Sequence, residues 1–210
     1  MSNLKKRLHS ILTHLKPTSP GRINHPYAWE NVAPELMGLF SEQIDPATKH
    51  RFMTAAIAEA RQSSLYPTVG AVVVKDGEIV GSGCRRVDKI LEAPPHWRVQ
   101  HAEQIALQRA GTNAQGAILY VTLEPCAARY QGATVEPAEV CSALIPPAGI
   151  ECVVIGLVDH DPMTCGKGLK RLQAAGIRLE YTYAGLEQDL LELVGDGHFG
   201  VLPAHVPFNA

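Results

Sequence analysis

The strongest constraint on the fold of this 210-residue chain is a set of three metal-ligating side chains that lie far apart in the sequence. His101 begins His-Ala-Glu, Cys126 ends Thr-Leu-Glu-Pro-Cys, and Cys141 follows after the 14 residues 127–140. One His and two Cys are sufficient protein ligands for a catalytic zinc ion, which keeps its fourth position open. A fold that uses this set must bring three distant segments together in one pocket.

Composition indicates a globular protein that acts on a small molecule. Hydrophobic residues make up 46% and charged residues 19% of the chain, enough for a full core. A net charge of −2 argues against a nucleic-acid partner. The densest apolar runs, 69–74 and 152–158, are far shorter than the roughly 20 residues of a membrane span. Five cysteines, an odd number, without a secretory signal favour the cytoplasm over a disulfide-bonded secreted protein.

The spacing of apolar residues predicts a first part of the chain that is helical. Leucine and isoleucine recur at helical intervals over 3–16, and Pro17 ends that helix. Residues 17–21 resemble a linker, and 31–43 are weakly helical. Residues 47–63 predict a core helix with one apolar face. A β-branched run then predicts a strand over 68–74, joined by a turn at 75–77 to a second strand over 78–84.

Later segments predict alternating strands and helices. Residues 85–100 carry Pro94-Pro95 and are expected to be irregular, and a helix begins at His101. Cys126 is expected at a helix N-terminus, where a thiolate is favoured. Further strands are predicted over 117–122, 150–157 and 178–183, and further helices over 139–144, 168–175 and 186–194. A hairpin followed by this alternation predicts a mixed sheet covered by helices on both faces.

The motifs together resemble a known family. His-x-Glu, then Pro-Cys, then a later Cys is the pattern of the cytidine-deaminase superfamily. Asp161-Pro162, Gly166-Lys167-Gly168 and Ala175-Gly176-Ile177 are similar to the pyrimidine deaminase domain of riboflavin biosynthesis. The resemblance covers about 51–183 and implies a three-layer α/β/α fold around a five-stranded mixed sheet. It also implies a homodimer or larger homo-oligomer.

With this resemblance, the chain divides into three parts. We expect an N-terminal helical extension and linker over 1–46 and a deaminase domain over 47–184. A C-terminal helix and a Gly- and Pro-rich tail would occupy 185–210.

The resemblance implies a Zn²⁺ site formed by His101, Cys126 and Cys141. Superfamily members usually place the second Cys three residues after the first, and the riboflavin-type domain uses a longer loop. The gap in this chain is longer again, so Cys165 or His160 stands as the alternative third ligand.

Glu103 is the expected catalytic residue. In zinc deaminases the Glu two residues after the His carries the proton and is not a metal ligand. Glu124 is expected to brace the turn at Cys126. Substrate contacts are expected from four further residues: Tyr66, Arg85, Ala102 and Trp97.

The expected reaction is hydrolytic deamination of an amino-substituted heterocycle, a pyrimidine-type base, nucleoside or nucleotide. Two departures from the riboflavin-type pattern favour a relative with its own substrate: Tyr66-Pro67 stands in place of Asn-Pro, and the loop 127–134 differs. A tRNA-type deaminase is one alternative, although the short-gap Pro-Cys-x-x-Cys is missing. A catalytically inactive zinc-binding assembly module is the other.

Overall fold

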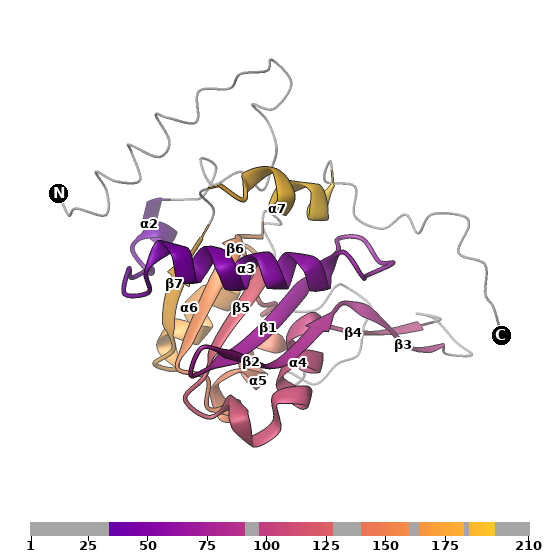
Figure 1. Ribbon diagram of the computed structural model, residues 1–210, viewed down its shortest axis with the longest axis horizontal. Helices are drawn as coiled ribbons and strands as arrows, with labels where there is room; N and C mark the ends of the chain where they lie inside the picture. The colour runs from indigo at the N-terminus through magenta and orange to yellow at the C-terminus, as the bar shows by residue number, and fades with distance from the viewer. Residues whose placement is uncertain (1–33, 91–96, 128–139, 160–163, 183–184, 196–210) are drawn as a thin grey trace, which may run out of the picture.

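A five-stranded mixed sheet forms the centre of the fold (Figure 1). The computed structural model describes residues 34–90, 97–127, 140–159, 164–182 and 185–195. The strands lie in the order β2-β1-β5-β6-β7, and β1 is antiparallel to both of its neighbours. β5, β6 and β7 are parallel to one another. Their bounds are β1 Gly70–Lys75, β2 Glu78–Cys84, β5 Ile118–Leu123, β6 Cys152–Leu157 and β7 Arg178–Tyr181.

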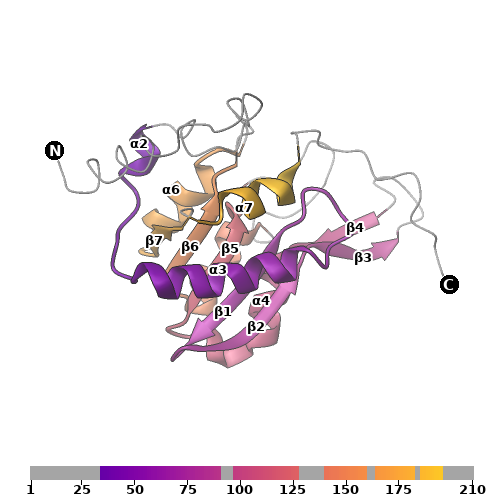
Figure 2. The ribbon, with the colours of Figure 1, turned by 45° about the horizontal axis from the view of Figure 1, so that its top comes forward.

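Helices cover both faces of this sheet. Their bounds are α2 Pro34–Met37, α3 Pro46–Ala60, α4 Ala102–Ala110, α5 Cys141–Leu144, α6 Lys167–Ala174 and α7 Glu187–Val194, with 3₁₀ turns at Gly111–Ala114 and Pro146–Ala148. α3 and α7 lie across one face, and α4, α5 and α6 lie behind the sheet (Figure 2). The predicted three-layer fold and mixed sheet are confirmed.

Glycines allow the helices of both layers to approach the sheet closely. A Cβ at Gly70 of β1 would lie 2.0 Å from the carbonyl oxygen of Ala56 in α3. On the opposite face, a Cβ at Gly81 of β2 would lie 2.3 Å from the carbonyl oxygen of Ala106 in α4. Because no larger side chain fits at either contact, these glycines determine how α3 and α4 sit on the hairpin.

The hairpin and the buried strands follow the sequence pattern. Asp76 and Gly77 have φ angles of 52° and 80°, and two positive φ angles in a two-residue loop are the requirement of a type I′ turn. All of β6 from Cys152 to Leu157 is buried, as expected for a parallel strand with helices on both faces.

The prediction that residues 85–100 are irregular is wrong in part. β3 (Arg86–Ile90) and β4 (Trp97–Gln100) form an antiparallel two-stranded sheet, which projects from one end of the main sheet (Figure 2). Its strands are short and pair only with each other among the described residues. β4 leads directly into His101.

The predicted helix start at Cys126 is not seen in the described part of the chain, since Cys126 and Ala127 are irregular and residues 128–139 lie outside it. The cysteine that begins a helix is Cys141, the first residue of α5. Glu124-Pro125 after β5 carries the chain past the sheet without forming a helical turn there.

Some expectations fall beyond the described ranges. These are the helix over 3–16, the linker over 17–21 and the tail over 196–210, and of the weak helix over 31–43 the described part contains only α2. The three-part division of the chain therefore stays a prediction. Across the segments that are described, we find no helix with the length and apolar character needed to traverse a bilayer.

A buried carboxylate joins the start of α3 to the edge strand β7. Glu180 has no exposed side-chain surface and accepts hydrogen bonds from the backbone N–H groups of Gln43 and Ile44. It is also paired with Lys49 at 3.4 Å and Arg178 at 2.7 Å. A buried charge is tolerated only with such partners, so Glu180 holds the segment before α3 against the sheet.

We predict that Gly70→Ala destabilises the protein by about 1–3 kcal/mol, because the new methyl group forces α3 away from β1. Thermal or urea unfolding measures the effect. Gly38→Ala is the matched control, since a Cβ there would meet only an ordinary contact of 3.5 Å. Equal stability of the two variants would contradict this account of the α3 contact.

Candidate metal centre

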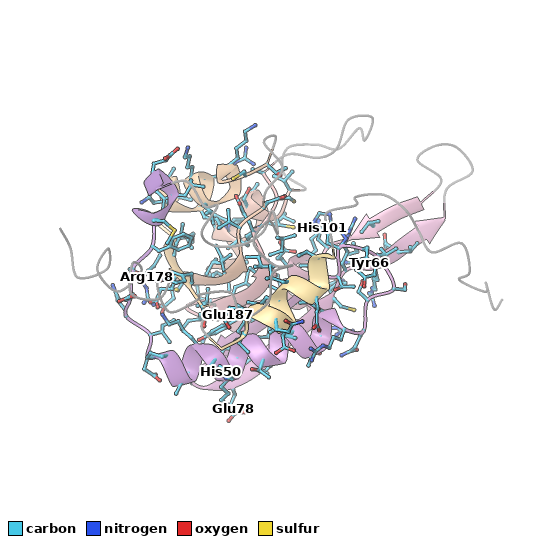
Figure 3. The ribbon with its side chains drawn as sticks, turned by 90° about the horizontal axis from the view of Figure 1, so that it is seen from above. His50, Tyr66, Glu78, His101, Arg178 and Glu187 are labelled. Carbon is cyan, nitrogen blue, oxygen red and sulfur yellow. The ribbon has the colours of Figure 1, made fainter. Side chains whose placement is uncertain are left out.

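Three elements meet at the candidate site. β5 ends at Leu123 and delivers Cys126, β4 leads into His101 at the start of α4, and Cys141 begins α5. His101 has an extended backbone, with φ −80° and ψ 155°, and its N–H donates to Oε1 of Gln104 at 2.9 Å. Figure 3 shows His101 at the same end of the molecule as Tyr66 and at the opposite end from Arg178.

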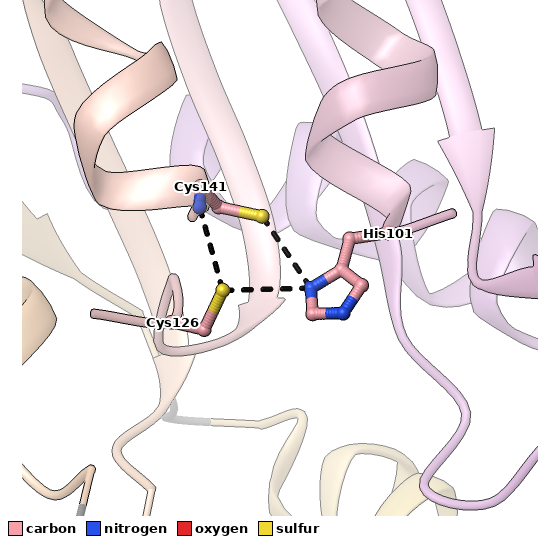
Figure 4. A group of neighbouring side chains, drawn as sticks. All are labelled: His101, Cys126 and Cys141. Atoms are coloured by element: carbon pink, nitrogen blue, oxygen red, sulfur yellow. Dashed lines mark hydrogen bonds between the residues drawn. The ribbon is translucent and has the colours of Figure 1, made fainter. Parts of the chain in front are cut away.

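The three ligand atoms are spaced as zinc requires. Nδ1 of His101 lies 3.6 Å from Sγ of Cys126 and 3.4 Å from Sγ of Cys141 (Figure 4). Zn–S and Zn–N bonds of about 2.3 and 2.05 Å at a tetrahedral angle place sulfur and nitrogen about 3.6 Å apart. All three ligand atoms lie within 4.8 Å of one another. The nitrogen that faces both sulfurs is Nδ1.

Two backbone N–H groups of α5 hold Cys126 beside Cys141. The N–H of Cys141 donates to Sγ of Cys126 at 3.3 Å, and the N–H of Ser142 donates to the carbonyl oxygen of Cys126 at 3.1 Å. The unpaired N–H groups at a helix N-terminus favour a thiolate. The helix that favours the Cys126 thiolate is thus α5, which lies across the loop and not directly after Cys126.

The protein environment separates the pKa values of the two thiols. The hydrogen bond that the Cys141 thiol donates to the Cys126 sulfur, together with neighbouring His101, lowers the pKa of Cys126 to about 4 despite burial. The same hydrogen bond and burial raise the pKa of Cys141 well above its usual value. For His101, burial would lower the pKa, but hydrogen bonding to Cys126 and its charge outweigh this and raise it. One thiolate and its two partners therefore form a hydrogen-bonded cluster.

Glu103 lies in the first turn of α4 and is almost completely buried. Burial raises the pKa of its carboxyl to about 7, while His101 and a hydrogen bond with Cys141 act in the opposite direction. A carboxyl group near neutrality can both accept and donate a proton. Glu103 contacts Cys141 but supplies none of the three ligand atoms, so its carboxyl is available for proton transfer.

The chemistry of this donor set fits zinc. Two sulfurs and one imidazole nitrogen suit this ion, and three protein ligands are typical of a catalytic zinc site. Within the described ranges, the grouped ligand set consists of His101, Cys126 and Cys141. Cys165 lies outside this group, and His160 lies outside the described residues.

Two of the expected substrate contacts are joined to each other. Nη1 of Arg85 donates to the carbonyl oxygens of Tyr66 at 2.9 Å and Pro67 at 3.1 Å. The Tyr66 side chain is 53% exposed, whereas Ala102 is fully buried at the start of α4. The charge of Arg85 also acts to lower the pKa of His101. Trp97 begins β4, but its side chain lies outside the described part.

Glu124, which was expected to brace the turn at Cys126, binds the backbone at the start of α6. Its carboxylate accepts backbone N–H groups from Asp159, Gly166, Gly168 and Leu169 at 3.0 to 3.4 Å. The sequence signal for this contact is an acidic residue after a buried strand, followed later by Gly166-Lys167-Gly168, whose glycines permit close approach of the backbone.

The sequence motifs also did not predict that Ser142 and Arg171 lie beside the ligand cysteines. Ser142 is fully buried next to Cys141, and Nη1 of Arg171 lies 3.5 Å from its Oγ. Neither residue belongs to a motif that stands out in the sequence.

Known proteins share this fold and these motifs. Residues 46–157 match the family described as the cytidine and deoxycytidylate deaminase zinc-binding region. The riboflavin biosynthesis protein RibD of Synechocystis is 36% identical over 165 residues, which are 79% of this chain and 40% of that protein. This chain therefore spans less than half the length of that relative.

Solved structures agree. RibD of Acinetobacter baumannii superposes with a TM-score of 0.56 at 32% identity, covering 71% of this chain and 38% of the other. A diaminohydroxyphosphoribosylaminopyrimidine deaminase/5-amino-6-(5-phosphoribosylamino)uracil reductase from Thermotoga maritima gives a TM-score of 0.54 at 33% identity. It covers 70% of this chain and 39% of that structure. Both identities exceed 30%.

We predict that a metal chelator exposes Cys126, but not Cys152, to alkylation by iodoacetamide. Cys126 is partly buried with a pKa lowered to about 4, whereas Cys152 is fully buried in β6 and burial raises its pKa to about 12. Only a thiolate is nucleophilic. Mass spectrometry of the labelled protein measures both sites. Labelling of Cys152 in the folded protein, or no effect of chelator on Cys126, would contradict the prediction.

Proposed function

This chain belongs to the family of cytidine and deoxycytidylate deaminases, and on that premise we propose that it is a zinc-dependent hydrolytic deaminase of an amino-substituted heterocycle. The observation that carries the proposal is the convergence of Nδ1 of His101 with the sulfurs of Cys126 and Cys141 at zinc-ligand spacing. The buried carboxyl of Glu103 beside these ligands supports a catalytic site over a purely structural one, which would have a fourth protein ligand.

His101, Cys126 and Cys141 would hold the zinc ion. When bound, zinc lowers the pKa of water from 15.7 to about 7 and so supplies hydroxide at neutral pH. The N–H of Cys141 in α5 donates to the sulfur of Cys126 and stabilises a thiolate before any metal arrives. The protein thereby orients one negatively charged sulfur toward the imidazole nitrogen in advance.

Glu103 would move the protons of the reaction. It accepts a proton from the attacking water and delivers it to the ring nitrogen next to the reacting carbon. The C–O bond forms at that carbon, the C–N bond to the exocyclic amine breaks, and a second proton transfer releases ammonia. One water is consumed, and the amino group is replaced by a keto oxygen, so atoms and charge balance. A carboxyl pKa near 7 suits a group that must both take and give a proton.

A pyrimidine-type base, nucleoside or nucleotide is the proposed substrate class. Support comes from similarity to RibD proteins and to the Thermotoga enzyme named for an aminopyrimidine. The net charge of −2 supports a small molecule over a nucleic acid. Assembly into a homodimer or larger oligomer remains a prediction of the same resemblance, and a cytoplasmic location remains a prediction from the cysteine content.

Tyr66 and Arg85 would shape the approach to the metal centre. Arg85 holds the backbone of Tyr66 and Pro67 through two hydrogen bonds, and its charge acts on His101. The exposed aromatic ring of Tyr66 provides a face on which a heterocycle can stack. Arg85 therefore holds the backbone from which this ring projects.

We predict that Glu103→Gln lowers the rate of ammonia release by roughly 10²–10⁴-fold, because the amide cannot transfer the proton. Zinc content, measured by atomic absorption, should stay at about one ion per chain, since Glu103 is not a ligand. Cys141→Ala is the matched comparison and should lose the metal as well as the activity. Turnover retained by Glu103→Gln would remove Glu103 from the mechanism.

A screen for ammonia release over pyrimidines, purines and pterins tests the substrate class, with zinc content measured alongside. We expect turnover of an aminopyrimidine by the zinc-loaded protein and loss of turnover after treatment with a chelator. Turnover confined to purines or pterins would overturn the pyrimidine assignment, and turnover that persists without metal would overturn the zinc mechanism.

A further inference from the structure

Helix α6 contacts the chain on both sides of Cys126, although it supplies no ligand. Before Cys126, the carboxylate of Glu124 accepts the N–H groups of Gly168 at 3.0 Å and Leu169 at 3.4 Å in the first turn of α6. After Cys126, Nη1 of Arg171 donates to the carbonyl oxygen of Ala127 at 3.2 Å. Cys126 is therefore bracketed by two polar contacts to one rigid element.

The first turn of α6 also approaches the backbone directly before Cys126. A Cβ at Gly168 would lie 1.9 Å from the carbonyl oxygen of Pro125. Such an approach leaves the Pro125 peptide no room to move toward α6. The contact therefore limits the movement of Pro125, the residue directly before Cys126.

Both carboxylate oxygens of Glu124 accept backbone N–H groups at or near the start of this helix. Glu124 is buried, with 6% of its surface exposed, and its second oxygen accepts the N–H groups of Gly166 at 3.0 Å and Asp159 at 3.2 Å. Hydrogen bonds from backbone N–H groups to a carboxylate, near a helix N-terminus, are among the strong ones. Each carboxylate oxygen accepts two N–H groups. An amide would replace one of these acceptors by an NH₂ donor, so Glu124→Gln would lose hydrogen bonds at one of the two positions.

The second cysteine is tied to the same helix. Nη1 of Arg171 lies 3.5 Å from Oγ of Ser142, which is fully buried beside Cys141, and α5 packs against α6. The N–H of Ser142 in turn donates to the carbonyl oxygen of Cys126. One guanidinium group thus faces both cysteine-bearing segments.

We propose that α6 sets the relative position of the two cysteine sulfurs, with Glu124 and Arg171 as positioning residues of the metal centre. This inference rests on the proposed zinc site and extends it to residues that touch neither the ion nor the substrate. Groups that orient metal ligands in this way typically contribute 10–100-fold to metal affinity.

The test compares Glu124→Gln and Arg171→Met with two matched controls in the full chain. Glu180→Gln alters another buried carboxylate that accepts backbone N–H groups, in the edge strand β7, which supplies no metal ligand. Lys170→Met removes a positive charge from an exposed position on the same helix α6. Zinc affinity is measured by competition with a chromophoric chelator, the ligand geometry by the visible spectrum of the Co²⁺-substituted protein, and stability by thermal unfolding.

We expect Glu124→Gln and Arg171→Met to lower zinc affinity by roughly tenfold or more and to shift the Co²⁺ spectrum. Glu180→Gln should lower only the unfolding temperature, and Lys170→Met should change none of the three. Because Arg171 is exposed, its variant decides the question even where Glu124→Gln does not fold.

Wild-type affinity and an unchanged Co²⁺ spectrum in Arg171→Met, while the wild-type protein binds zinc, would overturn this inference and leave the proposed function intact. Absence of zinc binding by the wild-type protein would overturn both.

Discussion

The candidate site depends on two hydrogen bonds from the first turn of α5 to Cys126. One N–H binds its sulfur and the next binds its carbonyl oxygen, so the side chain and the backbone of Cys126 are held by the same helical turn. Because Cys141 is the first residue of that turn, the two sulfurs are positioned together. The imidazole of His101 completes the group from a different element.

His101 owes its place to the way α4 lies on the hairpin. A Cβ at Gly81 or Gly83 of β2 would lie within 3 Å of the backbone of α4, so the helix rests directly on the strand. His101 precedes α4 and its N–H is bonded to the side chain of Gln104. Close contact between α4 and the backbone of β2 therefore places His101 at the start of the helix, where its imidazole meets Cys126 and Cys141.

The sequence predicted those features that depend on repeating patterns. Runs of buried β-branched residues predicted the strands, and helical spacing predicted α3, α4 and α7 to within a few residues. β3 and β4 were missed because they are short, although β3 contains the β-branched residues Val87 and Ile90. A pattern of five residues next to Pro94-Pro95 is weak evidence for a strand, since it forms no part of the main core.

Features that depend on tertiary contact were harder to predict. The helix that donates an N–H group to the Cys126 sulfur begins at Cys141, because a thiolate can accept from a helix that begins across a loop. Glu124 reaches the N-terminus of α6, more than 40 positions away, and the glycines at Gly166 and Gly168 do not by themselves identify it as their partner. The motif of His101, Cys126 and Cys141 identified which side chains to examine, and the fold brought their ligand atoms together.

The hydrogen bonds between Cys126 and α5 have a consequence for how such proteins diverge. Both ends of the connection between the two cysteines are anchored by hydrogen bonds that do not involve its interior. Lengthening an anchored connection costs little, since closure entropy grows only with the logarithm of its length. Insertions and deletions between Cys126 and Cys141 can therefore accumulate during evolution while the spacing of the two sulfurs is inherited unchanged.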